Sequence, residues 1–163
     1  MDLSFDITNT EGDKIKVALS YYDAETVNAL LPDPFVLTLE FYDVTLVREA
    51  GCKYVGYKML SAVSGILAKF LAENEDAVLC FYCDSATDVG RRHLGISSQE
   101  YRSNLFSSMF DRYTTSHGIS AFVNQRIKIE DTDNPQNSQF AHFICRKEHE
   151  RHIASIGGLL MDK

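Results

Sequence analysis

The apolar residues of this chain repeat with two different periods, and the order of these periods limits the folds that it can adopt. Apolar and polar side chains alternate over residues 3–7 and 15–21, which is typical of half-buried strands. From 53 to 73 the apolar residues instead recur every three or four positions, the period of an amphipathic helix. Alternating runs and long helical stripes in one chain favour an α+β fold.

The first half of the chain is predicted to begin with a hairpin. The turn composition of residues 9–12 joins the two alternating runs. A short helix over 23–30 would end at Pro32, because proline cannot continue a helix. Alternation from Phe35 to about Val47 predicts a third strand.

Residues 77–83 form a continuous apolar run bounded by charged residues. This pattern indicates a central strand that is covered on both faces. Cys80 and Cys83 would then point to opposite faces, so the two sulfur atoms would not share a metal ion. We interpret both as core cysteines.

A second long helix is predicted from about Ser98, with a capping box formed by Ser97 and Glu100. It should stop before Gly118. Two strands would follow, over 119–129 and 139–146, joined by the polar loop 130–137. The tail from Lys147 to Lys163 has helical spacing that Gly157 and Gly158 interrupt, so its structure is left open.

The predicted architecture is one α+β domain over residues 1–163. Its order is β-β-(α)-β-α-β-α-β-β-(α), with two long helices packed on a mainly antiparallel sheet of about six strands. On the first long helix, Val63 and Leu67 should face the core.

Composition narrows the classes of partner. The net charge of −7 argues against broad binding to nucleic acid or to anionic membranes. Residues 1–90 have a net charge of −9 and residues 91–163 a net charge of +2, so the second part of the chain is the better candidate for meeting an acidic partner. Self-association is left open.

No apolar run is long enough to span a bilayer, and the first residues do not resemble a secretory signal. We therefore expect a cytoplasmic protein with reduced cysteines.

Polar side chains gather in the segment that follows the apolar run 77–83. Asp84 and Asp88 offer carboxylates, Arg91 and Arg92 offer guanidiniums, and the second helix adds Arg102. Loops that leave a buried strand often carry binding residues, and a guanidinium matches a carboxylate or phosphate with two hydrogen bonds.

Three interpretations of this segment remain open. The two aspartates would bind Mg²⁺ while an arginine binds a phosphate; or Cys83 would act as a nucleophile with His93 as its base; or the segment is a polar loop in which Arg91 pairs with Asp88.

The same segment and the second helix resemble a family of small uncharacterised proteins from Bacteroidetes-type bacteria, over roughly residues 50–146. The resemblance rests on Cys83-Asp84-Ser85, Asp88, Arg91, Arg102-Ser103-Asn104-Leu105-Phe106 and Phe110. That family often has Trp near the end of the helix, where Met109 or Phe110 stands here. The resemblance implies a bacterial intracellular protein and no particular activity.

The sequence thus leads to a non-catalytic accessory or binding protein that engages a protein or a small anionic ligand. Its site residues would be Asp84, Asp88, Arg91, Arg92 and Arg102, with no cofactor and no metal. The alternative is a small metal-dependent hydrolase of phosphate esters or nucleic acid, with Asp84 and Asp88 as metal ligands.

Overall fold

The computed structural model describes residues 2–9, 12–22, 39–48, 57–83 and 97–154, and within them the chain is an α+β fold built on a six-stranded sheet. The strand order is β1-β2-β3-β4-β6-β5. The strands are β1 (Leu3–Thr8), β2 (Lys14–Tyr22), β3 (Glu40–Arg48), β4 (Ala77–Cys83), β5 (Phe122–Ile129) and β6 (Gln139–Arg146). The predicted fold class is confirmed.

One pair of neighbouring strands is parallel and the other four pairs are antiparallel. The parallel pair is β3 and β4, which are joined through helix α2 (Tyr57–Glu73) because a parallel connection needs a crossover. β4 lies between β3 and β6, so the prediction of a central strand over 77–83 is confirmed.

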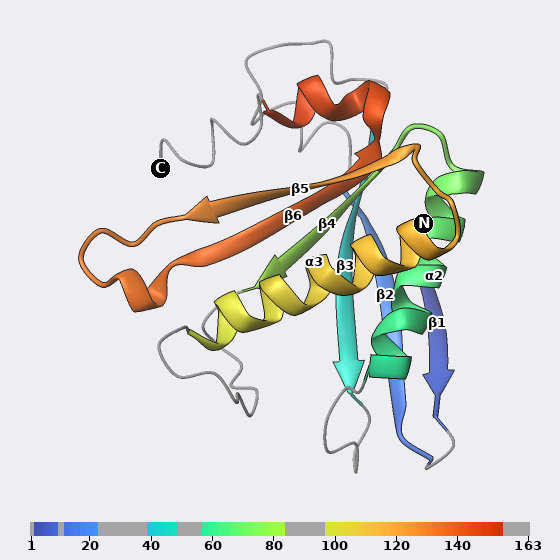
Figure 1. Ribbon diagram of the computed structural model, residues 1–163, viewed down its shortest axis with the longest axis horizontal. Coiled ribbons are helices and arrows are strands. Elements are labelled where there is room, and N and C mark those ends of the chain that lie inside the picture. Colours follow the sequence, from blue (N-terminus) through green and yellow to red (C-terminus); the bar gives the residue numbers. More distant parts are fainter. Residues whose placement is uncertain (1, 10–11, 23–38, 49–56, 84–96, 155–163) are drawn as a thin grey trace.

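Two long helices, α2 and α3 (Ser98–Ser116), pack on the same face of the sheet (Figure 1). The apolar stripe of α2 meets apolar side chains of β2, β3 and β4 in one core cluster. Val63 and Leu67 are almost completely buried there, as the helical spacing predicted. The buried members from the helices are Met59, Val63, Leu67, Phe70, Leu71, Phe106 and Phe110.

The ends of α3 follow the sequence signals. The Ser97 hydroxyl accepts a hydrogen bond from the Glu100 amide at 3.2 Å, which is the N-cap that the capping box predicts. At the other end Gly118 adopts a positive φ of 63°, a conformation that glycine accepts without a steric penalty. The Ile119 amide then donates to the Thr114 carbonyl, so β5 begins at Phe122 and not at Ile119.

The glycine in the middle of α2 lies at the contact with α3. A glycine inside a helix weakens it by about 1 kcal/mol relative to alanine, so Gly65 needs a packing reason. A Cβ at Gly65 would lie 3.2 Å from the Tyr113 hydroxyl. The absence of a side chain at Gly65 therefore lets α2 approach α3.

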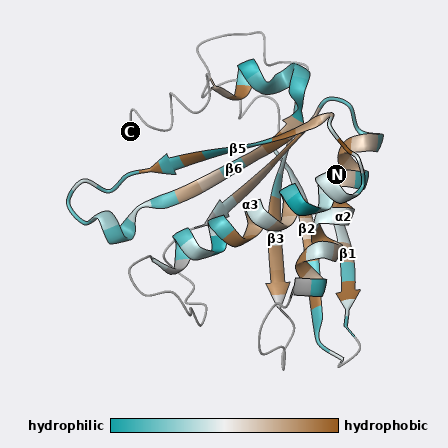
Figure 2. Cartoon of the chain, in the orientation of Figure 1, coloured by the Kyte–Doolittle hydropathy of each residue, from teal (hydrophilic) through white to brown (hydrophobic). Residues whose placement is uncertain are grey.

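The opposite face of the sheet is apolar over β4, β5 and β6. Val78, Ile127 and Phe143 belong to a second core cluster there, and Ile153 packs against it from the C-terminal segment. This segment has a 3-10 turn over Lys147–His149 and stays helical to Ala154. Figure 2 shows the change from these apolar strands to the hydrophilic end of the β5–β6 hairpin.

Some predicted elements lie outside the described residues. They are the short helix over 23–30, the start of the third strand and the first residues of the helix expected from 53. Among the described helices, none is long and apolar enough to cross a membrane.

Candidate functional site

Most of the predicted site residues lie outside the part of the chain that the structure describes. These are Asp84, Asp88, Arg91 and Arg92. Arg102 is described, and it is half-buried in α3. The grouping of these five residues therefore stays a prediction.

A different set of polar residues comes together where α3 crosses the β5–β6 hairpin. We call it the polar cluster, and it consists of Ser103, Asn104, Ser107, Asn124, Arg126 and His142. Alternate residues of a strand share one face of the sheet, so Asn124 and Arg126 of β5 both face α3. On β6, the same alternation directs Phe140 and His142 toward α3.

A chain of hydrogen bonds runs through the buried part of the polar cluster. His142 Nε2 lies 2.7 Å from Ser103 Oγ, and His142 Nδ1 lies 3.0 Å from Asn124 Oδ1. Asn124 Nδ2 donates to Ser107 Oγ at 3.3 Å, which fixes the orientation of the amide. Asn124 Oδ1 can only accept, so His142 carries its proton on Nδ1 and its Nε2 accepts from Ser103.

Burial keeps this histidine neutral. The exposed fraction of His142 is 0%, as is that of Ser103. Burial, and secondly the positive charge of Arg126, lower the pKa of His142 to about 4. At neutral pH His142 is therefore an uncharged acceptor for the Ser103 hydroxyl.

Aromatic rings enclose the imidazole on its apolar sides. The ring of Phe106 meets that of His142 edge to face, with 5.4 Å between centroids, and Phe81 stacks on Phe106 at 4.5 Å. These rings exclude water, so the hydrogen bonds of His142 form in a low-dielectric environment, where an unpaired polar atom would be costly.

Ser103, His142 and Asn124 have the hydrogen-bond polarity of a nucleophile, its base and the group that orients the base. A nucleophile must also be reached by its substrate, and Ser103 has no exposed surface. Acyl transfer at Ser103 would therefore require α3 to move away from the sheet. In this arrangement the three residues join α3 to β5 and β6.

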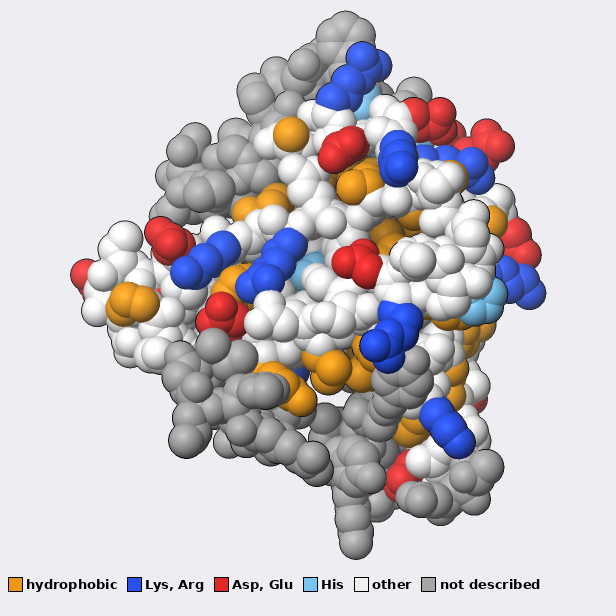
Figure 3. Space-filling model, viewed as in Figure 1, with side chains coloured by type: hydrophobic (Ala, Val, Ile, Leu, Met, Phe, Trp, Pro, Cys, Tyr) orange, Lys and Arg blue, Asp and Glu red, His pale blue; other side chains and the backbone are white. Residues whose placement is uncertain are grey.

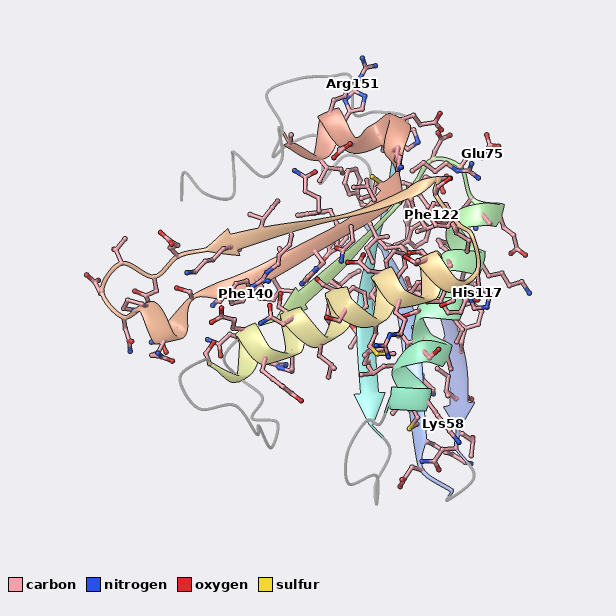
Figure 4. The ribbon with its side chains drawn as sticks, in the orientation of Figure 1. Lys58, Glu75, His117, Phe122, Phe140 and Arg151 are labelled. Carbon is pink, nitrogen blue, oxygen red and sulfur yellow. The ribbon has the colours of Figure 1, made fainter. Side chains whose placement is uncertain are left out.

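The exposed end of the polar cluster is Arg126, and two neighbours orient it. Its Nη1 donates to Asn104 Oδ1 at 2.7 Å, and its guanidinium lies 4.4 Å from the ring centroid of Phe140. Such a cation–π contact holds the guanidinium plane while leaving other N–H donors toward solvent. Figure 4 labels Phe140, which lies beside the first half of α3.

Arg126 has no carboxylate partner among the described residues, in contrast to its neighbour Lys128. Lys128 Nζ lies 3.5 Å from Glu130, whereas the described ion pairs do not include Arg126. Basic side chains lie next to each other over the β5–β6 hairpin, at the left of the view in Figure 3, and acidic side chains lie beside them. Among the described ion pairs the charge of Lys128 is matched by Glu130 and that of Arg126 is not.

The hairpin that carries Arg126 is fastened to the start of α3. The Gln99 side chain is buried, and its Nε2 donates to the carbonyls of Gln136 and Ser138 at 2.6 and 3.0 Å. The position of Arg126 relative to Asn104 is therefore set at two points, by Gln99 and by the polar cluster.

Among the residues whose side chains the structure describes, neither a group of metal ligands nor an activated thiol is present. No group of three or more His, Cys, Asp or Glu residues is arranged among them to hold a metal ion. Cys145 is a free thiol whose pKa is raised to about 12, by burial and secondly by Glu150. Burial also raises the pKa of the Cys80 thiol, with Asp43 and Cys145 adding to the effect, so both are poor nucleophiles.

The residue patterns did not predict the members of the polar cluster; Ser103 and Asn104 were named only as part of the resemblance. One signal was available for His142, which is a lone polar residue in the apolar run 140–145. A polar residue in a buried strand needs a partner, and Ser103 precedes Phe106 by three positions on the buried face of α3. Arg126 had no comparable signal beyond the positive net charge of residues 91–163.

Neither a family model, nor a curated protein, nor a solved structure matches this chain. The geometry of the described residues therefore carries the functional argument by itself.

Proposed function

We propose that this chain is a non-catalytic binding protein that recognises an anionic group, on a partner protein or on a small ligand, at Arg126. The observation that carries the proposal is the state of this guanidinium. It is exposed, it is oriented by Asn104 and Phe140, and it has no carboxylate partner among the described residues. A guanidinium held in this way loses little freedom on binding, and that lowers the cost of forming a two-hydrogen-bond contact with a carboxylate or phosphate.

The buried half of the polar cluster supports binding rather than catalysis. Ser103 and His142 have exposed fractions of 0%, so they are separated from any bound ligand. Their hydrogen bonds hold Asn124, two residues before Arg126 on the same face of β5. They therefore support the position of the arginine without contacting the ligand.

The proposal can be tested by NMR titration of the protein with inorganic phosphate and, separately, with acetate. We expect saturable shifts at Asn104 and at the Arg126 side chain, which Arg126→Ala abolishes. Arg126→Lys keeps the charge but loses the planar fork, so it should bind more weakly. Lys58→Ala, an exposed lysine of α2, is the matched control and should leave the shifts unchanged. Shifts that are the same in Arg126→Ala would contradict the proposal.

The segment from Asp84 to Arg92 is proposed as a second part of the same binding function, as its residue types suggest. Membership of the Bacteroidetes-type family, supported by the motif residues, and a cytoplasmic location are also proposals. If the segment takes part in binding, Arg91→Ala should weaken the binding of a partner without lowering the melting temperature. A lower melting temperature with unchanged binding would make Arg91 structural.

A further inference from the structure

The strand that carries Arg126 lies at the edge of the sheet. Among the described strands β5 pairs with β6 alone. An edge strand has a row of backbone N–H and C=O groups that can pair with another extended segment. β5 is eight residues long and contains neither proline nor glycine, so its residue types allow it to accept a further strand along its whole length.

The side chains of β5 that face α3 give this edge a charge pattern. Asn124, Arg126 and Lys128 are spaced two residues apart, and Arg126 and Lys128 are exposed. A strand added beside β5 would place its own side chains on this face at the same spacing of two. Side chains directly opposite in neighbouring strands have Cβ atoms about 5 Å apart, which is within reach of an ion pair.

We infer that β5 binds an extended acidic segment of a partner protein as an additional, seventh strand of the sheet, with carboxylates at alternate positions opposite Arg126 and Lys128. This inference rests on the proposed function, because it uses Arg126 as the anion-recognising residue, and it deepens that function by naming the ligand as an acidic β-strand. Backbone pairing would supply affinity, and the two basic side chains would select acidic residues at alternate positions.

A second copy of this chain is a poorer occupant of the same edge. If β5 paired with β5 of another molecule in an antiparallel register centred on Arg126, the two Arg126 side chains would lie directly opposite each other, and like charges directly opposite on neighbouring strands are destabilising. The opposite edge of the sheet, β1, carries the acidic residue Asp6 on its exposed face, but Ser4 and Thr8 lie on either side of it, so β1 does not offer carboxylates at successive alternate positions. Charge complementarity therefore favours an acidic partner over self-association.

The test uses an eight-residue peptide, the length of β5, with glutamate at alternate positions and threonine between. Two matched peptides separate the contributions: one has glutamine in place of glutamate, and one keeps the glutamates but is N-methylated at alternate residues, which removes backbone donors. We expect the glutamate peptide to bind saturably in fluorescence anisotropy. Both altered peptides should bind about tenfold more weakly or worse, since each loses interactions that total at least about 1.4 kcal/mol.

The protein variants follow the same logic. Arg126→Ala and Lys128→Ala should each weaken binding of the glutamate peptide, and both effects should shrink at high salt. Lys58→Ala on α2 should have no effect. Hydrogen exchange gives an independent readout, because amides of β5 should become protected when the glutamate peptide binds and should stay unprotected with the N-methylated peptide.

The possible outcomes distinguish strand addition, anion recognition at Arg126 and the identity of the occupant. If the N-methylated and unmodified glutamate peptides bind equally well, strand addition is wrong while anion recognition at Arg126 stands. If neither the peptide nor inorganic phosphate binds, both proposals fall. If the protein itself associates with rising concentration in size-exclusion chromatography and the amides of β5 become protected from hydrogen exchange as it does so, the occupant is a second copy, and an acidic partner strand is overturned.

Discussion

The two helices lie on the same face of the sheet, yet they meet it with different chemistry. The buried side of α2 is mainly apolar, with Met59, Val63 and Leu67 among its residues, and the hydroxyl of its buried Ser64 donates to a carbonyl of the same helix. The side of α3 combines buried aromatic rings with the buried polar residues Gln99 and Ser103. Apolar contacts depend mainly on area and volume, whereas hydrogen bonds also fix direction. We conclude that α2 mainly provides stability and that α3 mainly fixes the position of the hairpin that carries Arg126.

The largest change in the free energy of unfolding is expected from a substitution on the apolar face of α2. Leu67→Ala removes a fully buried side chain from α2 and should lower the free energy of unfolding by about 2–5 kcal/mol. Urea denaturation measures this change. Lys69→Ala, which is exposed on the same helix, should change stability by less than about 0.5 kcal/mol. Equal effects of the two variants would mean that the buried face of α2 is assigned wrongly.

The second prediction concerns the pH dependence of stability that His142 of the polar cluster causes. The pKa of His142 is about 4 in the folded protein, against about 6.5 for a histidine in an unfolded chain. As the pH falls from about 6.5 to about 4, the unfolded chain takes up a proton that the folded protein excludes. The contribution of His142 to the free energy of unfolding is therefore full above about pH 6.5. It falls by up to about 3 kcal/mol as the pH is lowered toward 4.

His142→Phe is the reference for this pH effect, because it removes the titrating group and keeps an aromatic ring. Urea denaturation of both proteins between neutral pH and pH 4 should show that the wild type loses about 3 kcal/mol more than the variant. Parallel pH profiles for the two proteins would mean that His142 is accessible to protons in the folded state.

The third prediction isolates the hydrogen bond between α3 and β6. Ser103→Ala leaves His142 Nε2 without its donor inside the core, which should cost about 1–3 kcal/mol. Ser108→Ala, at an exposed position of α3, controls for the change in helix propensity. If the two variants unfold at the same denaturant concentration, the polar cluster contributes no more to stability than a surface serine.

The smallest effect is expected at the ion pair on the hairpin. Lys128 and Glu130 have side-chain exposed fractions of 49% and 63%, and pairs this exposed contribute about 0–1 kcal/mol. Glu130→Ala should therefore leave the melting temperature nearly unchanged. It should strengthen binding of an acidic peptide, because it frees Lys128, and weaker binding would argue against a role for Lys128 in recognition.

The sequence predicted the fold well because period and capping are local properties. The alternation in β1 and β2, the stripe on α2 and the Ser97 cap each depend on residues that are close in the chain. The neighbour of Gly65 could not be obtained in this way. Its contact with Tyr113 of α3 depends on how the two helices lie against each other.

The candidate site was predicted much less well, for the same physical reason. Ser103 and His142 are 39 positions apart in the chain, and no spacing rule connects a helix residue to a strand residue across a packed interface. The predicted segment from Asp84 to Arg92 was chosen because its polar residues are adjacent in sequence. Of the five predicted residues, the structure describes Arg102 alone, half-buried in α3.

The parallel pairing of β3 with β4 has a consequence for how the protein folds during synthesis. The hairpins β1–β2 and β2–β3 join strands by antiparallel pairing, whereas the partner of β3 on its other side follows only after the whole of α2. Until β4 emerges from the ribosome, the edge of β3 next to Phe41 and Val44 stays without its partner strand. Exposed edges of this kind are where nascent chains aggregate, so the yield of folded protein should depend on how quickly β4 docks.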